Sequence, residues 1–114
     1  MSEGCIFCRI VAGEIPSEKV YEDQELLGFR DIRPAAPHHL LLIPKEHIAT
    51  FDDLEPRHDG LIGRLVRVAG EIAAREGLSA GYRLVGNCRA GAGQEVFHIH
   101  VHLLGGRPFG WPPG

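Results

Sequence analysis

Apolar residues recur at two different spacings along the chain, and the change of spacing separates helices from strands. Between Asp52 and Gly77 the period is 3.6 residues, and the apolar stripe lies apart from the charged positions, which predicts one long amphipathic helix. Pro56 suits the first turn of that helix, and Gly77 suits its carboxyl end. A second, short helical pattern begins at Ile6 and stops at Gly13.

The remaining apolar runs are short and predict strands at residues 19–22, 25–31, 38–43, 82–88 and 95–104. The polar pair Asp23-Gln24 separates the first two runs and indicates an antiparallel hairpin. The run from His38 to Ile43 is apolar on both faces after its first two residues, so we expect it in the middle of a sheet. The pattern as a whole predicts an α+β fold with about five antiparallel strands, one long helix packed on the sheet and one short helix.

Length and composition narrow the class of protein. A chain of 114 residues predicts one domain with a single core. Hydrophobic residues make up 44% of it and charged residues 24%, which is typical of a folded protein rather than a disordered one. A net charge of -3 supplies no basic field for nucleic acid or an anionic membrane, so we expect neither as a partner. The start of the chain lacks the pattern of a signal peptide, and we expect a cytoplasmic protein.

Histidine is the unusual residue: there are 7 in the chain, most of them in two short clusters. His98, His100 and His102 alternate with apolar residues, so on a strand they would share one face. The opposite face, expected in the core, would carry Phe97, Ile99, Val101 and Leu103. Because the pKa of imidazole lies near neutral pH, histidines repeated in register point to acid, base, nucleophile or metal-ligand chemistry rather than to a solvated strand face.

Two kinds of chemistry fit these histidines, and the residues alone leave both open. One is a metal site, which often adds a carboxylate, and Glu95 is close in sequence. The other is covalent catalysis on a phosphate, which needs a neutral, oriented imidazole and donors for the phosphoryl oxygens. The glycine-rich run Gly91-Ala92-Gly93-Gln94, directly before the histidines, is of a kind whose backbone approaches a phosphate closely.

The run His98-Ile99-His100-Val101-His102-Leu103-Leu104 resembles the signature of the histidine triad superfamily. Over nearly its whole length the chain is similar to the Hint branch, the histidine triad nucleotide-binding proteins. The other matching motifs are Cys5-Ile6-Phe7-Cys8, Gly13-Glu14-Ile15-Pro16, Asp31-Ile32, Pro34, Ala36-Pro37, His39, Ile43-Pro44-Lys45, His47-Ile48, Gly81-Tyr82-Arg83, Asn87, Gly93-Gln94, Gly105-Gly106-Arg107 and Trp111-Pro112-Pro113-Gly114. The last two favour Hint over the fragile-histidine-triad and galactose-1-phosphate uridylyltransferase branches.

The resemblance implies a hydrolase of purine nucleoside phosphoramidates that works by double displacement. His100 would be the nucleophile that takes the nucleotidyl group, and water would then release AMP or GMP. His102 would contact the phosphate and protonate the leaving amine, while His39 and His98 would complete the catalytic group. No cofactor would be required. Two alternatives remain: a nucleotide-binding regulatory module with little catalysis, and a dinucleoside polyphosphate hydrolase, against which the Trp-Pro-Pro-Gly end argues.

The resemblance also implies a nucleotide site. Asp31 would accept hydrogen bonds from the ribose hydroxyls, as an acceptor-only carboxylate suits. The phosphate oxygens would be held by Asn87, Gly93, Gln94, Glu95 and Val96. The apolar slot for the purine would consist of Ile6, Phe7, Ile10, Phe29, Ile32 and Leu41. Glu95 stands where some relatives carry Ser or Thr.

Cysteine usage raises the question of a metal. The chain has 3 cysteines, of which Cys5 and Cys8 form a C-x-x-C pair, and this fits reduced thiols or metal ligands better than a disulfide framework. The resemblance implies that His47 and His98 join them in a structural zinc site, since two thiolates and two imidazoles make a closed tetrahedral set. The alternative is a reduced, partly buried thiol pair. Cys88 is expected to be an ordinary strand residue.

The carboxyl-terminal tail of the chain is relevant to whether the protein forms a dimer. The resemblance implies a homodimer with joined sheets, in which the tail 105–114, including Trp111, reaches toward the partner's site. The alternative packs Trp111 on its own subunit. His38 and His58 are expected at the surface.

Overall fold

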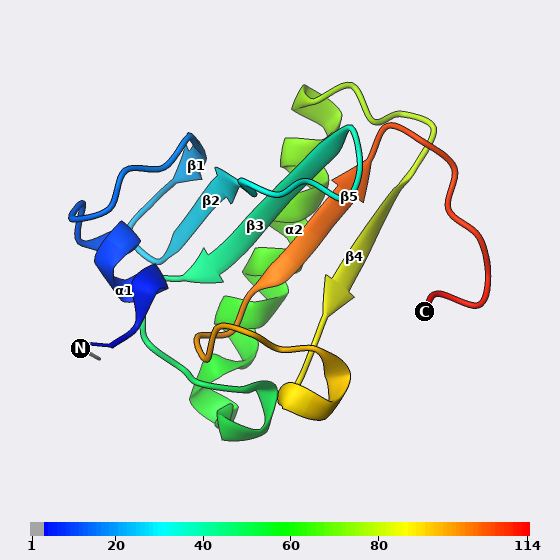
Figure 1. Cartoon of the computed structure of the whole chain (residues 1–114). Helices are drawn as coiled ribbons and strands as arrows, with labels where there is room; N and C mark the ends of the chain where they lie inside the picture. The colour runs from blue at the N-terminus through cyan, green and yellow to red at the C-terminus, as the bar shows by residue number, and fades with distance from the viewer. Residues whose placement is uncertain (1–3) are drawn as a thin grey trace.

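The computed structural model describes residues 4–114, which form one antiparallel sheet with helices on its two faces (Figure 1). Its helices and strands are α1 (Ile6–Val11), β1 (Lys19–Glu22), β2 (Leu26–Arg30), β3 (His38–Pro44), α2 (Asp59–Arg75), β4 (Tyr82–Gly86) and β5 (Val101–Gly105). The strand order is β1-β2-β3-β5-β4, and all neighbours are antiparallel. The predicted α+β fold, with a five-stranded sheet and β3 at its centre, is confirmed.

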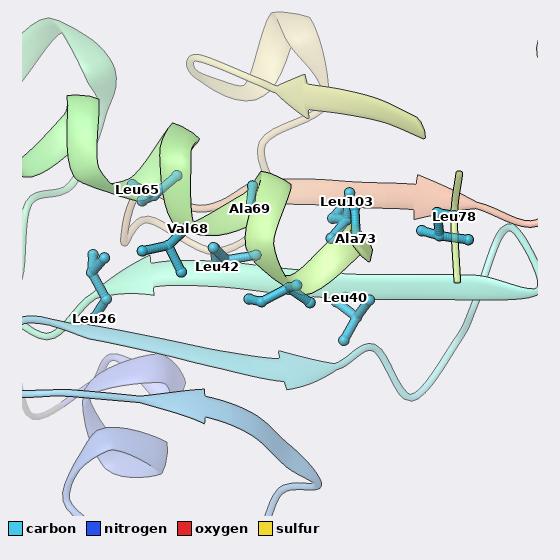
Figure 2. Close-up of a cluster of buried hydrophobic side chains, with 10 residues drawn as sticks. Leu26, Leu40, Leu42, Leu65, Val68, Ala69, Ala73, Leu78 and Leu103 are labelled. Carbon is cyan, nitrogen blue, oxygen red and sulfur yellow. The ribbon is translucent and has the colours of Figure 1, made fainter. Parts of the chain in front are cut away.

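The main core lies between α2 and one face of the sheet (Figure 2). Apolar side chains of α2 repeat at intervals of three and four residues, so they form one stripe that meets alternate residues of the strands. The buried members are Leu26, Leu40, Leu42, Leu65, Val68, Ala69, Ile72, Ala73, Leu78 and Leu103. Burial of each large side chain contributes about 1.5–3 kcal/mol. Gly77, with a φ of 77°, ends the helix and turns the chain toward β4.

A second core lies on the opposite face, where α1 covers the alternate residues of β2 and β3. Its buried members are Cys5, Phe7, Cys8, Ile10, Leu27, Phe29, Leu41 and Ile43. Cys5 caps α1, because its sulfur accepts a hydrogen bond from the Cys8 N–H at 3.3 Å. His39 lies on this same face of β3, and His102 lies opposite Leu41 in the register of β3 with β5. The histidines therefore share a face with α1, away from the main core.

Three predicted boundaries are wrong: the start of the long helix, the end of β4 and the start of β5. The long helix begins at Asp59, and two 3₁₀ helices, Phe51–Asp53 and Pro56–His58, precede it. Pro56 starts the second of these instead of α2. β4 ends at Gly86, so Cys88 lies beyond the strand.

The third of these boundaries is that of β5, which begins at Val101, so His98 and His100 precede the strand that was expected to carry them. The partner strand β3 ends at Pro44, which has no N–H to continue the ladder. The Ile99 N–H donates instead to the Ile48 carbonyl at 2.7 Å. Phe97, expected in the core, is 45% exposed because the strand alternation does not extend to it.

His58 is not at the surface as expected: only 3% of it is exposed. Its Nδ1 accepts a hydrogen bond from the Glu55 N–H at 2.9 Å, and its Nε2 lies 3.1 Å from a Glu46 oxygen. His38 is half-buried, with Nδ1 2.9 Å from a carboxylate oxygen of Glu76. Within residues 4–114, no helix has the length and apolar character needed to cross a membrane. The expectation about a signal peptide falls partly on residues 1–3, which lie outside the described residues.

Candidate active site

His39 on β3 and His102 on β5 form a hydrogen-bonded pair on the α1 face of the sheet. Their strands are neighbours, with Leu41 opposite His102 and Leu104 opposite His39, so the two rings stand diagonally across one face. The Nε2 atom of His39 lies 2.9 Å from the Nδ1 atom of His102. A carboxylate oxygen of Asp31, which directly follows β2, lies 3.4 Å from the same Nε2 atom. The fold thus brings together three of the predicted site residues.

His100 lies beside this pair, with its ring centre 5.1 Å from that of His102. Its Nδ1 atom is 2.8 Å from the backbone carbonyl oxygen of His98. A carbonyl oxygen only accepts hydrogen bonds, so this contact assigns the proton to Nδ1 and leaves the lone pair on Nε2. Phe7 of α1 packs edge-to-face against the ring, at 5.2 Å between centres. His100 is therefore fixed both by the backbone and by α1.

A backbone group also determines the protonation of His39. The Ala35 N–H donates to Nδ1 of His39 at 2.9 Å, so the proton of the neutral ring is on Nε2. That Nε2–H donates to Nδ1 of His102, which places the proton of His102 on its own Nε2. The site accordingly presents an Nε2 lone pair on His100 and an Nε2–H on His102.

The electrostatic surroundings favour the neutral form of the His102 and His39 rings. Burial, together with the neighbouring rings of His100 and His39, lowers the pKa of His102 to about 4, and Asp31 acts in the opposite direction. Burial also lowers the pKa of His39, again opposed by Asp31. A neutral imidazole is the form that serves as a nucleophile or hydrogen-bond donor without carrying its own charge into the site.

A second group of side chains lies next to the site histidines and consists of Cys5, Cys8, His47 and His98. Their ligand atoms all lie within 4.8 Å of one another, which is the spacing that a single metal ion requires. The Nδ1 atom of His98 lies 3.4 Å from the Cys5 sulfur, and that of His47 lies 3.3 Å from the Cys8 sulfur. The Nε2 of His98 lies 2.7 Å from the Pro44 carbonyl oxygen, so it donates there and turns the Nδ1 lone pair toward the thiols.

His98 therefore lies with the cysteines, although its sequence pattern places it with the other two triad histidines. It is fully buried, and burial lowers the pKa of its ring, which favours the neutral form that binds a metal. The backbone of His98 still contributes to the histidine site, because its carbonyl oxygen orients the ring of His100. The donor set of two thiols and two imidazoles fits a closed tetrahedral metal site.

The residues predicted to line an apolar slot divide into two sets. Four of them are buried together in the α1 core beside the histidines, namely Phe7, Ile10, Phe29 and Leu41. Ile6 is partly exposed, and Ile32 is 92% exposed at the turn after Asp31. Trp111, in the tail, is 85% exposed, so the described chain does not bury it on its own subunit.

The predicted phosphate loop joins β4 to the histidines and includes a short 3₁₀ helix, Ala90–Ala92. Asn87 directly follows β4, Gly93 has a φ of 96°, and Glu95 is exposed. Val96 packs against the α1 core. Gln94 is buried, and its carboxamide is hydrogen-bonded within the protein. The loop connects the end of β4 to the residues directly before His98, and its role in holding a phosphate stays a prediction.

Two features of the site carry no signal in the sequence pattern. The Ala35 N–H that orients His39 is a backbone group in a Pro-rich loop, and any non-proline residue supplies such a group. A hollow of about 570 Å³ lies beside the cysteine group and is lined by Gly4, Cys5, Ile6, His47, Ala49, Glu95, Val96 and Phe97.

A hollow of about 630 Å³, between residues 77–83 and 106–109, has none of the site histidines in its lining. We therefore place the chemistry at the histidines rather than in the larger hollow.

Comparison with known proteins agrees with this geometry. The family model described as "Scavenger mRNA decapping enzyme C-term binding" matches residues 4–108. A crystal structure of a HIT family hydrolase from Legionella pneumophila superimposes with a TM-score of 0.95 at 54% identity, over 97% of this chain and 100% of that one. The chain belongs to the histidine triad (HIT) family. The Hint branch, inferred above from the motifs, is supported.

Two curated relatives of this HIT protein are informative about chemistry. Purine nucleoside phosphoramidase from Escherichia coli is 50% identical over 111 residues, which cover 96% of this chain and 93% of that protein. A 14 kDa zinc-binding protein from Zea mays is also 50% identical over 111 residues, covering 96% of this chain and 87% of that protein.

Proposed function

We propose that this HIT protein hydrolyses the P–N bond of purine nucleoside 5′-phosphoramidates through a nucleotidyl intermediate on His100. The observation that carries the proposal is the 2.8 Å contact between Nδ1 of His100 and the His98 carbonyl, because it leaves the Nε2 lone pair ready to attack phosphorus. The name of the E. coli relative supports the class of substrate.

In the first displacement, Nε2 of His100 forms a bond to the α-phosphorus, and the P–N bond to the amine breaks. The leaving nitrogen takes the electron pair of that bond and needs a proton to depart as a neutral amine. In the second displacement, water attacks phosphorus and the bond to His100 breaks. The proton of the water passes to the site, and AMP or GMP leaves.

His102 contributes the donor for the phosphate and the proton for the leaving group. In the resting site its ring is neutral and its Nε2–H is available to a phosphate oxygen. An anionic phosphate raises the pKa of this ring in the same direction as the Asp31 carboxylate does, so bound substrate favours the imidazolium that protonates the amine. In the resting site His39 holds His102 in one tautomer, and its Nε2–H shifts toward Asp31, whose oxygen lies 3.4 Å away, when His102 takes a second proton on Nδ1.

Binding of the nucleoside falls to the surrounding residues. Asp31 offers its carboxylate to the ribose hydroxyls, and Asn87 with the loop residues Gly93, Glu95 and Val96 holds the phosphate. The purine would lie against the partly open edge of the apolar set, where Ile32 presents an exposed side chain.

We further propose that Cys5, Cys8, His47 and His98 hold a structural zinc ion. The mutual spacing of their ligand atoms supports this, as does the name of the Zea mays relative. When bound, the ion would join α1 to the segments that carry His47 and His98, and it would supply stability rather than chemistry. The proposed catalysis uses no cofactor.

We also propose that the protein is a homodimer. β4 is an edge strand of the sheet, Tyr82 on it is partly exposed, and Trp111 in the tail is open to contact. A second copy could extend the sheet and receive the tail 105–114 near its site. Sedimentation at micromolar concentration would then give the mass of two chains, and a monomer mass would contradict the proposal.

Turnover of an adenosine 5′-phosphoramidate that carries a fluorogenic amine tests the function directly. We expect hydrolysis by the wild type, and a loss of about 10⁴-fold or more in His100→Ala, as for removal of an enzymatic nucleophile. His38→Ala is the matched control, because His38 contacts Glu76 outside the site. A wild type that binds AMP without turnover would instead indicate a nucleotide-binding module. Faster cleavage of a dinucleoside polyphosphate would indicate a dinucleoside polyphosphate hydrolase.

A further inference from the structure

Arg89, in the loop between β4 and the histidines, holds a backbone conformation that residues with a side chain seldom adopt. Its φ is 72° and its ψ is 168°, and among residues 4–114 it is the only residue other than glycine with a positive φ. This region of backbone space is almost exclusive to glycine, because a Cβ atom crowds the neighbouring peptide groups. Such a conformation persists only where surrounding contacts hold it in place.

The contacts that hold the peptide groups of Arg89 come from Gln94 and from the Ala92 N–H, which donates to the Arg89 carbonyl at 3.1 Å. The Arg89 N–H donates to the side-chain oxygen of Gln94 at 2.7 Å, and the Gln94 N–H donates back to the Arg89 carbonyl at 3.1 Å. The amide nitrogen of Gln94 donates to the carbonyl oxygens of Ala49 at 2.7 Å and Val96 at 3.1 Å. Only 3% of Gln94 is exposed, so these bonds are shielded from competing water.

We propose that Gln94 is a positioning residue: its carboxamide clamps Arg89 in a glycine-like conformation and thereby sets the shape of the loop 87–96. This inference rests on the proposed function, since that loop contains Asn87 and the residues assigned to the phosphate. Through Ala49 the clamp also ties the loop to the segment that follows His47. Displacement of phosphate-binding groups by about 1 Å costs on the order of 10²-fold in rate, so loop shape matters for catalysis.

The same contacts argue against a direct bond from the Gln94 side chain to the nucleotide. A carboxamide has two N–H donors, and here the amide nitrogen already serves two carbonyl groups in part-buried hydrogen bonds. A substrate contact would therefore require one of these carbonyls to lose its partner, which is costly in a buried site. The resemblance assigned Gln94 to the phosphate, whereas the geometry assigns it to the loop.

The side chain of Arg89 contributes little to this arrangement. Its guanidinium lies 2.8 Å from Asp52, but the two side chains are 66% and 55% exposed. Ion pairs at this exposure are weak because water and salt screen them. This allows the backbone effect to be tested separately, since Arg89→Ala removes the ion pair and keeps the Cβ atom, whereas Arg89→Gly removes both.

The experiment compares Gln94→Leu in three backgrounds: wild type, Arg89→Gly and Arg89→Ala. We expect Gln94→Leu to lower kcat/KM for the adenosine phosphoramidate by about tenfold or more, because the loop loses its clamp. Adding Arg89→Gly should recover most of that loss, since glycine adopts the observed φ and ψ without support. Adding Arg89→Ala should recover none of it. Arg89→Gly alone should keep turnover close to that of the wild type.

Amide hydrogen exchange over residues 87–96, measured without nucleotide, makes the test independent of turnover. Exchange should be faster in Gln94→Leu and should return toward the wild-type rate when Arg89→Gly is added. If the wild type shows no hydrolysis, the proposed function fails while the exchange data still decide whether the clamp exists. If Gln94→Leu impairs turnover without faster exchange, and Arg89→Gly does not restore it, Gln94 contacts the ligand and the inference is overturned.

Thermal unfolding of the single variants covers the case in which Gln94→Leu does not fold. We expect Arg89→Gly to melt a few degrees above Arg89→Ala, because relief of the strained backbone outweighs the greater freedom of glycine in the unfolded chain. Equal melting temperatures, or a lower one for Arg89→Gly, would mean that Arg89 is not strained and would overturn the clamp.

Discussion

At the scale of single residues, backbone groups assign the ring protons of the site. The His98 carbonyl orients His100, and the Ala35 N–H orients His39, which in turn orients His102. Backbone groups cannot exchange roles as donor or acceptor, so each ring is held in one tautomer. The proposed nucleophile, His100, and the proposed donor, His102, are in this way distinguished before any substrate binds.

The depressed pKa of His102 predicts a dependence of stability on pH. The folded ring titrates at about 4 and the unfolded one near 6.5, so between these values the unfolded chain binds more protons. The free energy of unfolding should therefore decrease as pH falls from about 6.5 toward about 4, and His39 adds in the same direction. Urea denaturation of the wild type and of His102→Gln checks this.

The variant should show a shallower decrease over that range, because its side chain at 102 does not titrate. NMR titration of the His102 ring protons supplies the direct control. A ring that titrates near 6.5 in the folded protein, or equal slopes for the two proteins, would contradict the assigned environment.

The sequence could predict which residues form the site better than it could predict their separate roles. Alternation of histidine with apolar residues correctly indicated that the rings of His100 and His102 are neighbours, and the C-x-x-C pair correctly indicated a cluster of thiols. The turn of His98 toward Cys5 could not follow from alternation. It depends on the chain leaving the strand before Val101, which is a matter of tertiary contacts.

At the scale of elements, the sheet supports the site because each face has its own core. The α2 face carries the larger cluster of buried apolar residues, while the α1 face carries the histidines. Patterns of 3.6 and 2 residues were sufficient to predict α2 and the central position of β3. They did not predict where α2 begins, because turns near Pro56 repeat at a period close to that of a helix.

Leu42 on β3 tests the importance of the α2 core. Its side chain is fully buried against α2, so Leu42→Ala should lower the free energy of unfolding by about 2–5 kcal/mol through lost burial and a residual cavity. Val66→Ala on the exposed side of α2, where the residue is 49% exposed, should change it by less than about 0.5 kcal/mol. Similar losses for both variants in urea denaturation would show that α2 does not pack as described.

At the scale of the whole molecule, the cysteine group connects segments that are far apart in the chain. Cys5 and Cys8 lie near the start, His47 follows β3, and His98 precedes β5. An ion bound there would cross-link the α1 face near His100 and His102 without entering the proposed reaction. The separation between these segments, together with the absence of any local motif beyond C-x-x-C, is why the sequence left the metal open.

Metal removal should therefore lower stability before it affects chemistry. A ligand present at a hundredfold excess over its Kd stabilises the folded state by about 2.7 kcal/mol, and chelation should remove a stabilisation of this kind and lower the Tm. Elemental analysis should give one zinc per chain in the wild type and none in Cys8→Ser. Cys88→Ser is the matched control, since Cys88 lies outside the cluster and should leave the metal content unchanged. A metal-free wild type whose Tm is insensitive to added zinc would contradict the proposal.

The central claim is double displacement through a nucleotidyl group on His100, and the stereochemical course at phosphorus tests it most directly. The substrate is an adenosine 5′-phosphoramidate made chiral by sulfur at phosphorus and hydrolysed in isotopically labelled water. Each in-line displacement inverts the configuration, so two displacements should give net retention. The result does not depend on how long the intermediate lives. Net inversion would show that water attacks phosphorus directly, and it would contradict the role assigned to His100.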